Sequence, residues 1–279
     1  MFSMRYPKGL KKAITLSYDD GLVTDVKMLE IINRYGIKCT FNVNYGFLNK
    51  DDFVYPEIKR ENMWTRLRKS HAVELFKNSG HEVAAHGFVH KSLGGCTVPE
   101  AMHDILHDRE CLEKLFGTVI RGMAYANGSY DGRCAEYLPK CDICYSRTVD
   151  RTGKFDFPEN WIYLHPTCHH DNPKLMELLD SFLNEDFGDC KMFYLWGHSS
   201  EFEVNNNWDV LEKFCAVAGN RDDVWYATNI EIFDYKKAYD SLVYTVDGLT
   251  VYNPSGIDVW LNVNGESKVA KSGAVTNLV

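Results

Sequence analysis

Strand-like and helix-like segments alternate along most of this chain, from Ile14 to Thr228. Short apolar runs that read as buried strands occupy seven stretches, residues 14–20, 37–44, 81–86, 119–125, 143–149, 191–198 and 224–228. Helical spacing of apolar residues fills most of the gaps, at 24–35, 66–78, 99–116, 131–138, 173–182 and 208–217. Such alternation is typical of a parallel sheet with helices packed outside it. Seven strands favour an α/β fold of the distorted or incomplete (β/α) barrel type over an open sheet.

The alternation of strand-like and helix-like segments ends near Ser241. Short alternating strands follow at 242–246, 249–252 and 259–263, joined by Asp-Gly and Pro-Ser-Gly turns. A segment of this kind is too short to fold alone. We therefore predict a (β/α) barrel over residues 1–240 and a small β-strand appendage over residues 241–279.

Charge and composition argue against several classes of protein. A formal net charge of −8 is unlike that of a nucleic-acid binder, which normally presents a basic face. No apolar run approaches the roughly 18 residues of a membrane span, and the N-terminal residues lack the apolar core of a secretory signal. Nine cysteines without framework spacing indicate reduced thiols, so we expect a cytoplasmic protein. The sequence leaves the oligomeric state open.

Polar residues with catalytic potential gather where the expected strands end. Asp19 and Asp20 close the first strand before Gly21, while His86 and His198 close two others. In a (β/α) barrel the carboxyl ends of the strands share one face, and active sites lie there. The alternative for the two aspartates is an ordinary solvated Asp-Gly turn.

His86 and His90 stand four residues apart, a spacing that places two rings on one side of a helical turn. The pair is weak evidence alone, since His103 and His107 repeat it on a polar helix face. Together with one aspartate, however, the pair makes a facial set of two histidines and one carboxylate. That set leaves coordination positions open for water and substrate. The second carboxylate is then available as a base, and His198 as an acid.

Three motifs resemble those of the NodB-homology polysaccharide deacetylases, carbohydrate esterase family four. They are Ser17-Tyr18-Asp19-Asp20-Gly21, His86-Gly87-Phe88-Val89-His90 and Trp196-Gly197-His198, in the order of the family. The resemblance implies that Asp19 is the catalytic base and His198 the general acid. It also implies one divalent metal ion on Asp20, His86 and His90, with Zn as the first choice and Co, Ni or Fe as alternatives. The implied reaction is hydrolysis of an N- or O-acetyl group on a sugar or oligosaccharide.

The third family motif, usually Arg-Pro-Pro-Tyr-Gly, appears here only as Ala-Tyr-Ala-Asn-Gly over residues 124–128. Its arginine is missing, and Asn127 stands at the tyrosine position, although the backbone N–H of Asn127 can still serve as oxyanion donor. Arg147, at the end of the following strand, is the candidate for the missing cation beside Asp19. Gly87 replaces the Ser/Thr of the second motif, so a hydrogen bond that steadies the ligand loop is expected to be lost.

Aromatic residues near these motifs are candidates for substrate contacts, namely Tyr125, Trp196 and Trp208. Core packing explains Trp208 equally well. The stretch 161–170 is rich in rings and imidazoles, and we interpret it as a loop with surface histidines. The alternative is that its last two histidines line the substrate groove.

Two other functions stay open. One is an amidohydrolase of the same superfamily that cleaves a non-sugar amide, since some relatives of that kind work without metal. The other is a glycan-binding barrel that has lost catalysis. The altered third motif favours such a loss, whereas the retention of Asp19 and His198 opposes it.

Overall fold

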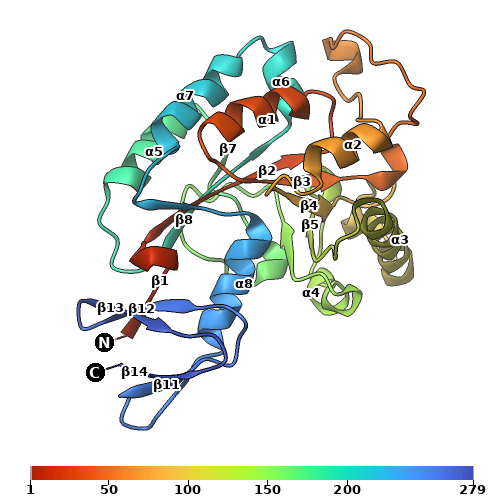
Figure 1. Ribbon diagram of the computed structural model, residues 1–279. Coiled ribbons are helices and arrows are strands. Elements are labelled where there is room, and N and C mark those ends of the chain that lie inside the picture. Colours follow the sequence, from red (N-terminus) through yellow and green to blue (C-terminus); the bar gives the residue numbers. More distant parts are fainter. Residues whose placement is uncertain (1, 279) are drawn as a thin grey trace.

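The computed structural model describes residues 2–278, in which one large parallel sheet is wrapped by helices and two small antiparallel sheets lie beside it (Figure 1). The strands are β1 (Phe2–Arg5), β2 (Lys12–Asp19), β3 (Cys39–Val43), β4 (Glu82–Ala85), β5 (Gly122–Ala124), β6 (Tyr145–Arg147), β7 (Cys168–His169), β8 (Lys191–Gly197), β9 (Val224–Tyr226), β10 (Val243–Tyr244), β11 (Thr250–Tyr252), β12 (Val259–Val263), β13 (Glu266–Ala270) and β14 (Val275–Asn277). The α-helices are α1 (Asp25–Arg34), α2 (Lys69–Phe76), α3 (Val98–Phe116), α4 (Cys134–Tyr137), α5 (Leu175–Asn184), α6 (Ser199–Val204), α7 (Trp208–Ala218) and α8 (Asn229–Asp240).

The large sheet runs in the order β6-β5-β4-β3-β2-β8-β7, and every neighbouring pair in it is parallel. The short β9 pairs with the first residues of β2, whereas β3 pairs with the last ones. Within residues 2–278 no strand pair joins β6 to β7, so the barrel is open between them. The predicted fold, a distorted and incomplete (β/α) barrel of about seven parallel strands, is confirmed.

β2 is the central strand because its neighbours and the helices around it cover nearly all of its residues. Only Lys12, its first residue, is partly exposed. A strand buried on both faces needs a run of apolar or β-prone residues, which residues 13–18 supply. The strand ends at Asp19 because the backbone turns left-handed at Asp20 and Gly21, with φ of 84° and 61°. Both carboxylates are thereby delivered to the carboxyl edge of the sheet.

α3 shows how local sequence sets the length of an element. Thr97 and Glu100 form a capping box at its start, which satisfies free backbone N–H groups. Gly117 ends it with a φ of 67°, a left-handed conformation that glycine adopts without cost. The helix predicted over 99–116 is confirmed and is one residue longer.

Several elements were not predicted, namely β1, β7, β13, β14, α6 and α8. β7 has only two residues, too few for a periodic pattern. The start of α8 was missed because Thr228, which caps the helix together with Glu231, had been assigned to the strand predicted over residues 224–228. α2 begins at Lys69 rather than at residue 66. The reason is that Arg66 is extended and forms an isolated bridge with Leu22.

The five strands of the C-terminal segment, together with β1, form two three-stranded antiparallel sheets below the barrel in Figure 1. β12 pairs with β13 and also with the N-terminal β1, so both ends of the chain contribute to this region. β11 pairs with β10 and β14. α8 lies between these sheets and the barrel and contacts both β12 and β2. The proposed division of the chain at residue 240 stays a prediction.

In the described part of the chain, no helix combines the length and the apolar character that crossing a membrane requires.

Candidate active site

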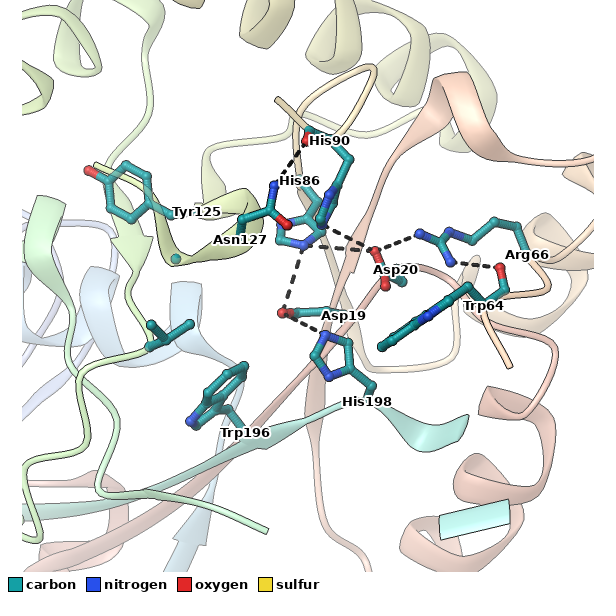
Figure 2. Close-up of a pocket in the computed structure, with 12 residues that line it drawn as sticks. Asp19, Asp20, Trp64, Arg66, His86, His90, Tyr125, Asn127, Trp196 and His198 are labelled. Carbon is teal, nitrogen blue, oxygen red and sulfur yellow. Dashed lines mark hydrogen bonds and ion pairs between the residues drawn. The ribbon is translucent and has the colours of Figure 1, made fainter. Parts of the chain in front are cut away.

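The end of β2 brings two adjacent carboxylates into one pocket. Along a regular strand Asp19 and Asp20 would point to opposite faces. The left-handed backbone at Asp20 breaks that alternation, and its N–H donates to the carbonyl of Asn42 at 2.7 Å. Both side chains are buried and line a cavity of about 580 Å³ at the carboxyl edge of the sheet (Figure 2).

His86 and His90 lie on a tight loop after β4, not on the helical turn that their spacing suggested. Positive φ angles at Gly87 (80°) and His90 (54°) bend this loop. The two rings stand 4.8 Å apart in an edge-to-face arrangement. Asn44 steadies the bend, since its side-chain amide donates to the carbonyls of His86 and Gly87 at 2.6 and 2.7 Å.

Two aspartates of α3 hold the same loop from behind. Asp104 accepts a hydrogen bond from the backbone N–H of Phe88 at 3.0 Å, and Asp108 accepts one from the N–H of His86 at 3.1 Å. A Cβ atom at position 87 would lie 2.8 Å from Asp104 Oδ2, so Gly87 leaves the room that this carboxylate needs. The loop is therefore held without the Ser/Thr side chain of the usual motif.

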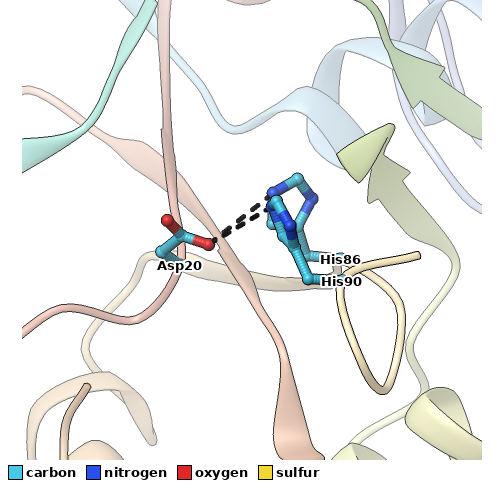
Figure 3. Close-up of side chains that lie close together, drawn as sticks. All are labelled: Asp20, His86 and His90. Carbon is cyan, nitrogen blue, oxygen red and sulfur yellow. Dashed lines mark ion pairs between the residues drawn. The ribbon is translucent and has the colours of Figure 1, made fainter. Parts of the chain in front are cut away.

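Asp20, His86 and His90 offer the donor set of a metal site (Figure 3). Asp20 Oδ1 lies 3.9 Å from Nε2 of His86 and 3.7 Å from Nε2 of His90. His86 Nδ1 is 2.9 Å from the carbonyl of Ala124, an acceptor that fixes the proton on Nδ1 and leaves the lone pair of Nε2 facing Asp20. Asp20 Oδ1 is buried and accepts no hydrogen bond from any residue of the described range. Two imidazoles and a carboxylate fit a divalent transition-metal ion.

Arg66 is a cation at this site that the sequence did not reveal. Its Nη2 lies 2.9 Å from Asp20 Oδ1, in an ion pair that lacks the alignment of a hydrogen bond. Its Nη1 donates to the carbonyl of Trp64 at 2.7 Å. Arg66 was predicted as the first residue of a helix over residues 66–78, whereas it lies in the loop before α2, so the sequence did not indicate this contact. The guanidinium of Arg66 therefore faces the same Asp20 oxygen as the imidazoles of His86 and His90.

Asp19 is enclosed by groups that keep it ionised. The fully buried Arg147 forms an ion pair with Oδ2, and Asn42 donates to Oδ1 at 2.8 Å. The Nε2 atoms of His86 and His198 lie 3.7 and 3.8 Å from Oδ2. Burial raises the pKa of Asp19, but the charges of Arg147 and the two imidazoles outweigh burial and bring the pKa down to about 2.

His198, directly after β8, is held between two carboxylates. Its Nδ1 is 3.3 Å from Glu201 Oε1, while its Nε2 faces Asp19. Burial lowers the pKa of His198, but the hydrogen bond to Glu201 and the charge of Asp19 outweigh burial and raise the pKa above its usual value. His198 is therefore a better proton carrier near neutral pH than a free histidine.

The interpretation of His169 and His170 as surface residues is wrong. Both are buried where β7 ends beside β8, and their Nε2 atoms lie 3.2 and 2.9 Å from Glu201 Oε2. Burial raises the pKa of Glu201, but hydrogen bonds from His169, His170 and His198 outweigh it and hold the pKa far below its usual range. Glu201 is thus an ionised carboxylate shared by three imidazoles.

Aromatic side chains wall the cavity. Trp196 lines it, together with Asn127, whereas the ring of Tyr125 is turned away from the two aspartates, and its hydroxyl donates to the carbonyl of Ile162 at 2.9 Å (Figure 2). Trp64 adds a wall that the sequence did not single out, from the long loop between β3 and α2. Trp64 is 47% exposed, and its ring stands edge-on to the ring of His198, with 5.1 Å between the ring centres. A half-exposed ring next to the acid–base pair is placed to contact whatever enters the pocket.

Trp208 does not line this cavity. At the start of α7, its ring contacts Phe202, and its indole N–H donates to Glu203 at 2.6 Å. The ammonium of Lys27 lies 4.7 Å from the centre of the ring. Trp208 therefore packs α6 against α7 and lies outside the site.

Residues 7–145 match the family model described as polysaccharide deacetylase. The chain belongs to this family. A search of the curated proteins found no match. Among solved structures, the chain is similar to a Mycobacterium smegmatis protein named as a polysaccharide deacetylase, at 17% identity and a TM-score of 0.58, over 85% of this chain and 94% of that one. It is also similar to a CE4 family pseudoenzyme from Bacillus anthracis, at 14% identity and a TM-score of 0.50, over 83% of this chain and 68% of that one.

As a polysaccharide deacetylase, the protein belongs to a group of hydrolases that act on acetyl groups and in general depend on a metal ion. The family implies an acetylated carbohydrate as substrate. The two similar structures establish the fold alone at these levels of identity. Which residues of this chain perform the reaction must be argued from its own site.

Proposed function

We propose that this protein is a metal-dependent hydrolase that removes an N- or O-acetyl group from a small or soluble sugar or oligosaccharide. The observation that carries the proposal is the meeting of Asp19, Asp20, His86, His90 and His198 in one cavity. Such a set contains a place for a cation, a base and an acid around one reaction centre.

Asp20, His86 and His90 are the residues that would hold the ion, Zn²⁺ as the first choice and Co²⁺, Ni²⁺ or Fe²⁺ as alternatives. A divalent ion in such a site supplies Lewis-acid polarisation of a carbonyl and a lower pKa for water. Burial lowers the pKa of His86 to about 4, so its imidazole is neutral, as a ligand must be, at neutral pH.

Asp19 is the proposed base. Its pKa of about 2, lowered by Arg147 against the effect of burial, keeps the carboxylate ionised, and Asn42 fixes its orientation through Oδ1. The ion pair with Arg147 supplies the cation that the usual third motif would provide from another position. Asp19 takes a proton from the attacking water, so that the nucleophile forms beside the acetyl carbon.

His198 is the proposed acid. Its imidazolium donates a proton from Nε2 to the leaving amine or alcohol when the tetrahedral intermediate collapses. Glu201, at 3.3 Å from Nδ1, holds the ring and favours the charged form. The backbone N–H of Asn127 is the proposed oxyanion donor, and Trp196 is the proposed aromatic contact for the sugar.

A metal-independent amidohydrolase is a second candidate, and Arg66 is the observation that favours it. A guanidinium already lies 2.9 Å from the ligand oxygen of Asp20. In a site without metal, this cation would balance the charge of Asp20 and the substrate would be a non-sugar amide. A catalytically inactive glycan-binding barrel has no comparable observation in its favour.

The test is acetate release by metal-stripped protein from N-acetylated chito-oligosaccharides and O-acetylated xylo-oligosaccharides. We expect release only after Zn²⁺, Co²⁺ or Ni²⁺ is restored. No release with any of these ions, from protein shown to hold metal, would refute the deacetylase proposal. Hydrolysis of ureides or cyclic imides by the stripped protein would establish the metal-independent alternative.

A further inference from the structure

A second cluster of imidazoles lies on the far side of His198 from Asp19. Within residues 2–278, two groups of three side chains have donor atoms close enough to hold an ion, the set at Asp20 and a set made of His169, His198 and Glu201. The donor atoms of this second set all lie within 4.8 Å of one another. The proposed function uses Glu201 only to hold His198 and uses His169 not at all.

We propose that His169, His198 and Glu201 form a second divalent-cation site, distinct from the one at Asp20. Its distances suit a transition-metal ion. His169 Nε2 lies 3.2 Å from Glu201 Oε2, and His198 Nδ1 lies 3.3 Å from the other oxygen, Oε1, so each imidazole faces one oxygen of the same carboxylate. Around a tetrahedral ion with bonds of about 2.0–2.2 Å, neighbouring donor atoms stand roughly 3.3–3.6 Å apart. Two imidazoles and one carboxylate are also the ligand types that such ions select.

The groups behind these ligands accept the protons that the ion would displace. His169 Nδ1 lies 2.8 Å from Asp171 Oδ1, so this ring can carry its proton on Nδ1 and turn the lone pair of Nε2 toward Glu201. The backbone N–H of Asp171, 3.2 Å from the same Nδ1, favours the opposite tautomer when no ion is present. His198 can likewise carry its proton on Nε2, which faces Asp19 at 3.8 Å. A carboxylate behind a metal-bound histidine is a common support for metal ligands.

His170 is excluded from the ligand set by its own hydrogen bonds. Its Nδ1 lies 3.2 Å from the hydroxyl of Tyr18. The carboxylate of Glu201 can only accept, so its contact with His170 requires a proton on Nε2, and the Tyr18 hydroxyl then donates to Nδ1. The proton of His170 is therefore on Nε2, from which it donates to Glu201 at 2.9 Å. His170 orients the carboxylate and leaves the ion to the other three residues.

Occupation of this site has a consequence for catalysis, which rests on the proposed role of His198 as acid. An ion on Nδ1 prevents His198 from becoming an imidazolium, so the leaving group loses its proton donor. Excess metal is therefore inhibitory, although metal at Asp20 is required. Loss of a general acid lowers turnover by about a hundredfold or more. The existence of the second site does not depend on this role.

The test is metal stoichiometry, measured by equilibrium dialysis against Zn²⁺ with elemental analysis. We expect two ions on the wild-type chain, one on His169→Gln and one on His90→Gln, which loses a ligand of the first site. His198→Gln should lose the same ion as His169→Gln. A control, His103→Gln, disrupts the pair with His107 on α3, where the rings are 6.0 Å apart, and should still bind two ions.

A single ion on the wild-type chain, or two on both His169→Gln and His198→Gln, would overturn the proposal. In the acetate assay, excess Zn²⁺ should inhibit the wild type about a hundredfold relative to one equivalent, and His169→Gln far less. Absence of acetate release from every variant would count against the proposed function alone, because the stoichiometry decides the second site independently.

Discussion

Replacing Arg147 with methionine should destabilise the protein severely, because it leaves the buried Asp19 without its cation. Arg147 is fully buried and Asp19 is 3% exposed. Burial raises and Arg147 lowers the pKa of Asp19, which stands at about 2 against an ordinary 3.8. At about 1.4 kcal/mol per pKa unit, this shift corresponds to about 2 kcal/mol of stability at neutral pH. Because the folded pKa is depressed, that contribution is present above pH 3.8 and is lost as pH falls toward 2.

Replacing Arg147 should cost more stability than the pKa shift of Asp19 alone accounts for, because the carboxylate of Asp19 stays buried without a partner cation. We expect the free energy of unfolding to fall by about 3–5 kcal/mol. The assay is urea unfolding of the metal-free protein at neutral pH, followed by circular dichroism. Arg34→Met, which breaks an exposed ion pair with Glu212, is the matched control and should cost about 0–1 kcal/mol.

A double variant isolates the charge. Arg147→Met combined with Asp19→Asn should be more stable than Arg147→Met alone, because the buried group is then neutral. A cost below about 1 kcal/mol for Arg147→Met, in the range of an exposed pair, would refute the reasoning. So would a double variant no more stable than the single one.

Three further substitutions test the walls and supports of the site. Gly197→Ala would place a Cβ 2.1 Å from His170 Nδ1, so we expect lost stability in a thermal melt and weak activity. An unchanged melting temperature would contradict that contact. Glu201→Gln should lower the pKa of His198, because the neighbouring negative charge is gone. The basic limb of the pH–rate profile should therefore move to lower pH. A basic limb that stays in place would show that Glu201 does not raise the pKa of His198. Trp64→Ala should raise KM about two- to tenfold if the ring stacks on the sugar, because such a ring contact is worth roughly 0.5–1.5 kcal/mol. The melting temperature should not change. An unchanged KM would show that the ring does not touch the substrate.

The sequence predicted the barrel because its strands and helices carry the two periodicities that backbone geometry demands. The same reasoning placed Asp19, Asp20, His86 and His198 at strand ends, since parallel strands bring their carboxyl ends to one edge. Arg147 was placed beside Asp19 because the third family motif lacks its arginine and the strand that carries Arg147 ends at the same edge. The structure brings all five of these side chains together.

What the sequence did not reveal depends on contacts between distant segments. Arg66 was predicted to begin a helix, but it is extended in the loop before α2 and reaches Asp20 from there. The role of Glu201 was not predicted, because nothing local in the sequence indicates that three imidazoles converge on it. β7 is too short to be read from a pattern, and its histidines were therefore placed at the surface. Trp208 followed His198 closely in sequence, but α6 carries it away from the pocket.

The central claim is that Asp20 binds the metal while Asp19 acts as the base. The most direct test is to measure bound metal and acetate release on the same preparation of Asp19→Asn. We expect this variant to retain one ion at Asp20, His86 and His90 and to lose turnover. Loss of the ion would mean that the roles of the two aspartates are reversed. Retention of both ion and turnover would show that Asp19 is not the base.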